Sequence, residues 1–183
     1  MKTCDFFYFL LLFSSPILLV SFYHPASFLP WSAVDDAVMG GLSSSRLLFD
    51  AAGHADFSGT VSLANNGGFA SVRTAPGDYA APGALLFRLS VRGDGRRYKL
   101  NLRTDDAHDG ANYQAAFTPL AGEWSEVLLA LEAFAARYRG RPISAPPLDP
   151  ARVRRLGLMI ADRQAGSFRL SLRWLRAEGP ASL

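Results

Sequence analysis

The side chains best suited to acid–base or nucleophilic chemistry do not form a recognisable catalytic set in this sequence. The histidines are His24, His54 and His108, and no nucleophile elbow, phosphate-binding loop or zinc-ligand spacing accompanies any of them. Cys4 is the only cysteine, so the chain forms neither an internal disulfide nor a thiolate metal site. We therefore expect a protein that works by binding, with no catalytic residue, no cofactor and no metal.

The acidic residues also lack a catalytic pattern. Glycoside hydrolysis needs two carboxyl groups that flank one bond, and the sequence does not show that Asp94 and Asp162, for example, lie close together. The densest acidic segment, residues 105–110 (DDAHDG), has neither the spacing nor the closing Glu of an EF-hand loop. We interpret it as a solvated hairpin loop.

A pair of carboxylates, Asp35 and Asp36, stands beside the flexible Gly40-Gly41 turn. This arrangement can bind a cation or an arginine, or it can cap backbone amides in a structural loop, and we favour the structural role. Other polar turn residues and two strand-ending arginines are expected to gather with it, either as a brace between loops or as the rim of a partner-binding surface. The candidate binding residues are Trp31, Asp35, Asp36, Gly40, Gly41, Asn65, Asn66, Arg73, Asp94, Arg103 and Asp162.

Composition favours one globular domain with a recognition surface. The chain has 183 residues, of which 49% are hydrophobic and 12% aromatic, which suits one core and excludes a disordered protein. The net charge of +3 is too small to imply nucleic acid. Apart from Lys2 and Lys99, every basic side chain is arginine, which makes planar, bidentate contacts and stacks on aromatic rings.

Ten short segments with alternating or apolar patterns, separated by Gly, Asn, Asp and Pro, position these residues and predict strands. They are 17–22, 46–50, 56–63, 69–73, 85–92, 98–103, 113–118, 124–131, 156–161 and 168–175. Residues 132–138 are the one helical candidate. We predict an all-β fold, a two-sheet jelly-roll sandwich over 17–178 with a short tail at 179–183.

The paired strands 85–92 and 98–103, joined by a hairpin at Gly93-Asp94-Gly95, are expected to share one polar outward face. That face would carry Arg88, Ser90, Arg92, Lys99, Asn101 and Arg103. It would extend to Arg169, Ser171 and Arg173 if Phe168, Leu170, Leu172 and Trp174 point inward.

The first residues differ from the rest, because 1–30 contain no arginine and are rich in phenylalanine. Three interpretations stay open for this leader: a secretory signal, a membrane span, or an extension (1–16) that precedes a first strand at 17–22. We favour the strand, since β-branched and aromatic residues suit it. The expected location is then cytoplasmic, or exported or tethered to a membrane if residues 1–22 act as a signal or anchor.

Several blocks of this sequence together resemble the complex I intermediate-associated protein 30 family. They are WSAVDDAVMGGLS at 31–43, FSGTVSL at 57–63, NNGGFASVR at 65–73, RGDGRRYKL at 92–100 and GLMIADRQAGSF at 157–168, with Tyr113-Gln114 and Trp124 between them. The resemblance covers about residues 17–176, and the chain is similar to bacterial, single-domain members.

This resemblance implies a galactose-binding-like jelly roll. It also implies a chaperone-like partner of an assembly intermediate of respiratory complex I (NADH:ubiquinone oxidoreductase), and not an enzyme. The fold is shared with carbohydrate-binding modules, so a sugar ligand is the alternative to a protein partner. We expect no nucleic acid partner, and membrane contact stays open.

Overall fold

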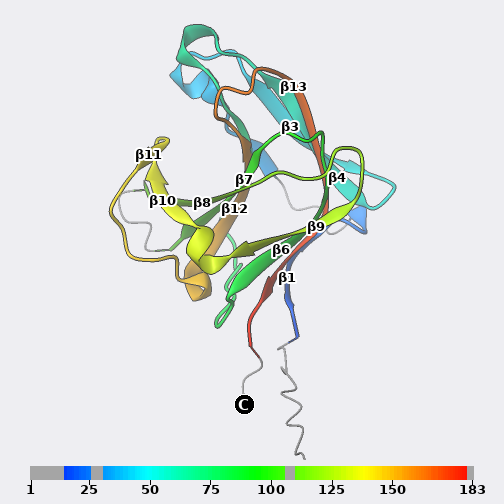
Figure 1. Ribbon diagram of the computed structural model, residues 1–183, viewed down its shortest axis with the longest axis vertical. Helices are drawn as coiled ribbons and strands as arrows, with labels where there is room; N and C mark the ends of the chain where they lie inside the picture. The colour runs from blue at the N-terminus through cyan, green and yellow to red at the C-terminus, as the bar shows by residue number, and fades with distance from the viewer. Residues whose placement is uncertain (1–14, 26–30, 106–109, 181–183) are drawn as a thin grey trace, which may run out of the picture.

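The protein is a jelly-roll sandwich of two antiparallel sheets, as predicted, in a computed structural model that describes residues 15–25, 31–105 and 110–180 (Figure 1). One sheet has the order β3-β4-β13-β6-β9, with β1 also paired to β13. The other has the order β11-β10-β8-β7-β12-β5-β2. Within the described residues, helical structure is limited to short 3-10 turns.

The six-stranded sheet consists of β1 (Ile17–Ser21), β3 (Ser44–Asp50), β4 (His54–Val61), β6 (Leu86–Arg92), β9 (Ser125–Ala130) and β13 (Gly166–Glu178). The seven-stranded sheet consists of β2 (Trp31–Ala33), β5 (Ala70–Thr74), β7 (Tyr98–Thr104), β8 (Asn112–Phe117), β10 (Ala135–Tyr138), β11 (Arg141–Pro142) and β12 (Val153–Ile160). The turns are η2 (Asp36–Met39), η3 (Ala64–Asn66), η5 (Leu131–Ala133) and η6 (Pro150–Arg152).

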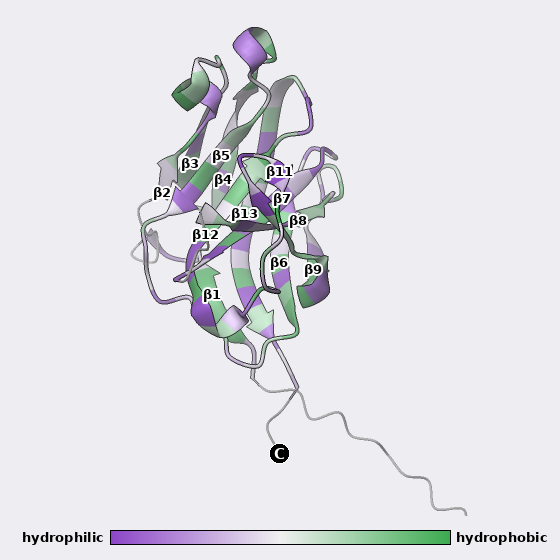
Figure 2. Ribbon diagram, turned by 90° about the vertical axis from the view of Figure 1, so that its left-hand side faces the viewer, coloured by the Kyte–Doolittle hydropathy of each residue, from purple (hydrophilic) through white to green (hydrophobic). Residues whose placement is uncertain are grey.

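The core lies between the two sheets because alternate residues of each strand point inward. Figure 2 shows this pattern as alternating hydrophilic and hydrophobic bands along several strands. At its centre, the rings of Phe57 and Phe168 lie 4.9 Å apart and both contact Tyr98 from the opposite sheet. The apolar residues that alternate with polar ones along the predicted strands are buried, namely Phe87, Leu89, Val91, Tyr98, Leu100, Leu102, Phe168 and Leu170.

The polar face predicted for strands 85–92 and 98–103 is wrong, because these strands belong to different sheets. β6 pairs with β13 and β9, whereas β7 pairs with β12 and β8. The turn at Gly95, which has φ of 80°, therefore crosses from one sheet to the other. Alternation alone predicts which residues of a strand share a face but not which sheet the strand joins. The face splits into Arg88, Ser90, Arg92, Arg169, Ser171 and Arg173 on one sheet and Lys99, Asn101 and Arg103 on the other.

Trp174 is a second correction. The register of β13 shifts between Leu172 and Trp174, so Leu175 and Ala177 take the inward positions that simple alternation gives to Trp174. Trp174 is still only 6% exposed, but it lies outside the core cluster, with the Arg176 guanidinium 4.1 Å from its ring. A β-bulge moves every later residue to the other face of the sheet.

The helix predicted at 132–138 is also wrong. The chain makes the turn η5 and then β10, which pairs with β8 and brings Ala136 opposite Tyr113. Phe134, between them, is buried with its ring 5.4 Å from that of Phe87. Tertiary packing and strand pairing outweigh the local helical preference here.

The first strand expected at 17–22 is present as β1, which pairs with β13. Residues 1–14 of the leader lie outside the described residues, as do 106–109 of the acidic loop. Among the residues described, no helix is long and apolar enough to span a membrane. Gly68 and Gly95 both have positive φ, of 141° and 80°, a conformation that glycine adopts readily in turns.

Truncating Leu100 tests the core. Leu100→Ala should lower the free energy of unfolding by about 2–5 kcal/mol, because Leu100 is 1% exposed and its removal leaves a cavity. Chemical denaturation measures the change. The matched control is Leu128→Ala on β9, where the side chain is 53% exposed, and it should cost less than about 1 kcal/mol. Equal losses in the two variants would contradict the assigned inward face of β7.

Candidate functional site

Asp36 is a fully buried carboxylate that ties three segments together. Its Oδ1 accepts a hydrogen bond from the Ser43 N–H at 2.9 Å. Its Oδ2 accepts from the Ser43 hydroxyl at 2.5 Å and from the N–H groups of Gly68 and Phe69 at 2.7 and 3.3 Å. Burial by itself raises the pKa of Asp36, but the hydrogen bonds from Ser43, Gly68 and Phe69 hold that pKa below its ordinary value of 3.8. Asp36 is therefore a charged brace between the η2 loop and the starts of β3 and β5.

Two glycines make room for this brace. A Cβ at Gly41 would overlap the Asp36 carboxylate, and a Cβ at Gly67 would lie 2.6 Å from its Oδ2. Gly40 ends η2 in the left-handed conformation, and the Asn65 side-chain amide donates to the Gly40 carbonyl at 3.1 Å. The structure thus brings Asp36, Gly40, Gly41 and Asn65 together, while Asn66 is exposed on the neighbouring turn.

Asp35 makes a parallel set of contacts. Its Oδ2 accepts from the Ser45 N–H at 2.7 Å, and its Oδ1 accepts from the Ser45 hydroxyl at 2.6 Å. The same Oδ1 accepts from the Ser71 N–H at 2.9 Å. Since Ser45 belongs to β3 and Ser71 to β5, Asp35 links one sheet to the other. The hydrogen-bonding capacity of both carboxylates is directed at the protein itself.

The other predicted acids lie apart from this brace. Asp94 accepts from the Tyr98 hydroxyl at 2.9 Å and from the Arg169 N–H at 3.0 Å, which fixes the crossing turn against β13. Asp162 pairs with Lys99, with 2.7 Å between Oδ1 and Nζ. The predicted loop cluster therefore divides into separate structural contacts, and its two arginines are found elsewhere.

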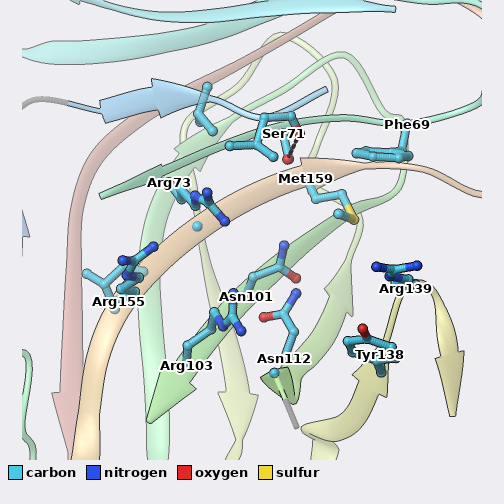
Figure 3. Close-up of a pocket in the computed structure, with 15 residues that line it drawn as sticks. Phe69, Ser71, Arg73, Asn101, Arg103, Asn112, Tyr138, Arg139, Arg155 and Met159 are labelled. Carbon is cyan, nitrogen blue, oxygen red and sulfur yellow. Dashed lines mark hydrogen bonds between the residues drawn. The ribbon is translucent and has the colours of Figure 1, made fainter. Parts of the chain in front are cut away.

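Arg73 and Arg103 line a pocket of about 280 Å³ on the outer face of the seven-stranded sheet (Figure 3). Figure 3 shows Arg73, Arg103 and Arg155 on one side of this pocket, with Tyr138 and Arg139 on the other. We call it the arginine pocket. Its walls include Phe69, Ser71, Arg73, Asn101, Arg103, Asn112, Tyr138, Arg139, Arg155, Gly157 and Met159.

The strand register explains why the three arginines meet. Arg155 on β12 lies opposite Arg103 on β7, and Gly157, two residues further, lies between Arg73 on β5 and Asn101 on β7. Residues directly opposite each other in a sheet have their Cβ atoms about 5 Å apart. Leu156 and Leu158, which alternate with Arg155 and Gly157 on β12, point into the core. The guanidinium groups of the three arginines therefore lie together on the outer face of the sheet.

These three arginines have no carboxylate partner within the described part of the chain, unlike five arginines elsewhere. Arg88, Arg96, Arg152, Arg154 and Arg169 each form an ion pair with Asp or Glu. At the pocket, burial and the positive charges of Arg73 and Arg155 lower the pKa of Arg103. The three positive charges therefore repel one another, and such a patch attracts anions.

Two asparagine side chains lie between the arginines and Tyr138. Asn101 is only 8% exposed, and its Oδ1 has no hydrogen-bond partner among the residues described. The buried Oδ1 of Asn112 is in the same state. Buried polar atoms are nearly always hydrogen-bonded, so these two oxygens are unsatisfied in the part of the chain that the structure describes.

The tryptophans are poorly placed to form a binding platform. Trp124 is covered by the guanidinium groups of Arg173 and Arg92, at 4.0 and 5.0 Å from its ring. Trp31 lies in the edge strand β2, partly buried, with its ring 6.3 Å from that of Phe22. With Trp174 buried, the exposed aromatic ring at the arginine pocket is that of Tyr138, which is 42% exposed.

One set of side chains, Asp50, His54 and Asp56, has ligand atoms within 4.8 Å of one another and the donor types for a metal ion. The His54 Nε2 lies 3.5 Å from Asp56 Oδ1 and 4.0 Å from Asp50 Oδ2. However, Asp56 already accepts hydrogen bonds from Arg169 and Ser171. Burial raises the pKa of Asp56, yet these bonds hold it below its ordinary value. We assign no metal here, because the carboxylate already has a cationic partner.

Sequence reasoning missed Arg155, Asn112, Tyr138 and Met159. The alternation of Arg155, Gly157 and Met159 with buried Leu156 and Leu158 was the available signal for β12. Asn112 and Tyr138 had no such signal, because their place depends on β10 pairing with β8.

The comparisons with known proteins agree on the fold. Residues 20–172 match the family described as Complex I intermediate-associated protein 30 (CIA30). No curated protein sequence matches the chain significantly.

Solved structures share the sandwich at low sequence identity. The chain is similar to a family 11 carbohydrate-binding module from Clostridium thermocellum in complex with a β-1,3-1,4-mixed-linked tetrasaccharide, with TM-score 0.64 and 14% identity. This match covers 94% of this chain and 99% of that one. The chain is also similar to part of an agarase, with TM-score 0.58 and 15% identity. This second match covers 93% of this chain and 25% of the agarase. These likenesses establish the fold alone.

Replacing Asp36 tests the brace and its pH dependence. Asp36→Asn should lower the free energy of unfolding by about 1–3 kcal/mol at neutral pH, because an amide cannot accept all of these hydrogen bonds. The pKa of Asp36 is lower in the folded state, so its contribution is present above the ordinary value of 3.8 and is lost as the pH falls through the lowered value. Denaturation at several pH values should therefore show the unfolding free energies of the variant and the wild type converging in acid.

The control is Asp78→Asn, at an exposed carboxylate, which should change the free energy of unfolding little. A constant difference at all pH values would contradict the charged brace.

Removing a pocket arginine tests the unrelieved repulsion. Arg155→Gln should leave the free energy of unfolding unchanged or raise it by up to about 1 kcal/mol at low salt, and the gain should shrink at high salt. Arg169→Gln should instead destabilise the protein, since it leaves Asp56 without its cation. If Arg155→Gln destabilises as much as Arg169→Gln, Arg155 has a structural role and the repulsion argument is wrong.

Proposed function

Because the chain belongs to the complex I intermediate-associated protein 30 family, we propose that it is a non-catalytic binding protein. In this proposal it associates, in the manner of a chaperone, with an assembly intermediate of a respiratory complex. The partner is a protein, and the chain supplies a preformed surface to it.

The observation that carries the proposal is the arginine pocket. Its basic and amide groups stand on the strands β5, β7, β8 and β12, which hold their positions by backbone pairing. Arg73, Arg103 and Arg155 repel one another, and the buried amide oxygens have no partner among the described residues. Repulsion between like charges and unpartnered polar atoms both destabilise the free protein. A ligand that supplies negative charge and hydrogen bonds would account for keeping them on one surface.

A carbohydrate ligand is the second candidate, favoured by the shared sandwich with a sugar-binding module over nearly the whole of both chains. Sugar sites usually present an exposed aromatic face on which a ring stacks. Here the guanidinium of Arg139 lies over the ring of Tyr138, 5.3 Å from its centroid, and occupies the available platform. This contact is the reason why we place the protein partner first.

A capture experiment with matched variants tests the proposal. The tagged chain, expressed in its native cells, should co-purify with subunits of a respiratory NADH dehydrogenase. Arg103→Gln combined with Arg155→Gln should reduce this capture by about tenfold or more, because both charges lie in the proposed contact. Arg46→Gln, an exposed arginine on β3 of the other sheet, should leave capture within about twofold.

Two results of this experiment would contradict the proposal. Capture of respiratory subunits that does not change in the double variant would remove the arginine pocket from the proposed function. Absence of respiratory subunits, together with binding of the purified chain to oligosaccharides in an affinity gel, would replace the protein partner by the sugar.

A further inference from the structure

We propose that the arginine pocket recognises an acidic segment of the partner protein, whose Asp or Glu carboxylates pair with Arg73, Arg103 and Arg155. This inference rests on the proposed function, because it takes the partner to be a protein. It adds the chemistry by which that partner is recognised.

The first argument is charge. Three guanidinium groups converge on adjacent strands, and neither an ion pair nor a hydrogen bond to them is found within the described ranges. Of the described carboxylates nearby, Asp162 pairs with Lys99 and Asp105 pairs with Arg152. Within the described ranges, the pocket therefore has no carboxylate that balances its charge, and a ligand can supply one. Arginine's planar fork matches a carboxylate bidentately.

The second argument is independent of charge. Asn101 is more than nine-tenths buried, lines the pocket and carries an amide oxygen with no partner among the residues described. In Figure 3, Asn101 and Asn112 lie between the arginines and Tyr138. A side-chain amide can accept from a backbone N–H and donate to a backbone C=O, so this pair suits a peptide laid between the charged groups.

The third argument is the glycine at the centre of the pocket. Gly157 stands in the middle of β12, between Arg73 and Asn101, where its missing side chain leaves the floor open. A Cβ there would meet the Val72 carbonyl oxygen at 3.1 Å. Glycine within a strand often marks a place where a ligand or another backbone approaches closely.

The spacing of the arginines also suits an extended peptide. Arg73, Arg155 and Arg103 stand on β5, β12 and β7, which are neighbours in the sheet and so about 4.8 Å apart from one to the next. Alternate side chains of an extended chain lie about 6.6 Å apart on one face. Acidic residues at alternate positions can therefore reach guanidinium groups of different strands at once.

Binding of short model peptides to the full chain tests this inference. N-acetyl hexaglutamate should bind at low ionic strength and shift the backbone amide resonances of β5, β7 and β12, whereas hexaglutamine should not. Arg103→Gln should weaken the binding of hexaglutamate by about tenfold, as expected for one charged hydrogen-bonded contact. Arg46→Gln carries the same charge change on the other sheet and should weaken it by less than about twofold.

Met159 provides a variant that does not remove a pocket arginine. Met159→Glu places a carboxylate at the pocket and should abolish hexaglutamate binding by pairing with the arginines, while Met159→Gln should retain it. Thermal unfolding of each variant confirms that it is folded before it is titrated.

Three results would overturn the inference. Hexaglutamate that binds equally to the wild type, Arg103→Gln and Arg46→Gln would show attraction to overall charge and not to this pocket. Trigalacturonate that binds and depends on Arg103, when hexaglutamate does not bind, would assign the pocket to an acidic saccharide. If hexaglutamate fails but cellular capture still depends on Arg103 and Arg155, the acidic segment is wrong and the proposed function stands.

Discussion

The buried carboxylate of Asp36 is the interaction on which the arrangement of the loops and the edge of the binding face depends. A buried charge is costly unless it is hydrogen-bonded, and here donors from Ser43, Gly68 and Phe69 surround it. These donors come from the segments that enter β3 and β5, one in each sheet. Asp35 repeats the link through Ser45 and Ser71. The two carboxylates thus hold the sandwich together at one end and set Phe69 and Ser71 in the wall of the arginine pocket.

The pocket itself is built with the opposite logic. The brace satisfies the charges of Asp35 and Asp36 with hydrogen bonds from the chain. The pocket instead gathers like charges and contains two amide oxygens with no partner among the described residues. Strands of the sheet, and not loops, carry these groups, so the guanidinium positions are set by backbone register and need little reorganisation on binding. The polar groups of the loop brace are thus satisfied, whereas two buried amide oxygens on the seven-stranded sheet are not.

The sequence allowed the all-β fold, most strands and the core to be predicted, because alternation is a local property of each strand. Phe87, Leu89 and Leu100 are buried for that reason. It could not predict that the turn at Gly95 joins different sheets, since a tight turn looks alike in both cases. Nor could it predict the bulge that turns Trp174 out of the core, or the pairing that makes β10 a strand.

The candidate site was predicted only in part, for the same reason. Asp35 and Asp36 were recognisable as a loop pair, and Arg73 and Arg103 as strand-ending cations. Their separation into a brace and a pocket depends on contacts between β5, β7 and β12, which lie far apart in the chain. Arg155 joins Arg73 and Arg103 only through that long-range register, so the local sequence pattern does not identify it as a site residue.

The central claim is that the outer face of the seven-stranded sheet is where the partner sits, and site-specific photocrosslinking in the native cell measures this directly. A photoreactive amino acid would replace Met159 on β12 in one variant and Leu128 on β9 of the other sheet in a second. The account predicts crosslinks to a respiratory-complex protein from position 159 and none from position 128. Crosslinks from position 128 alone would contradict it.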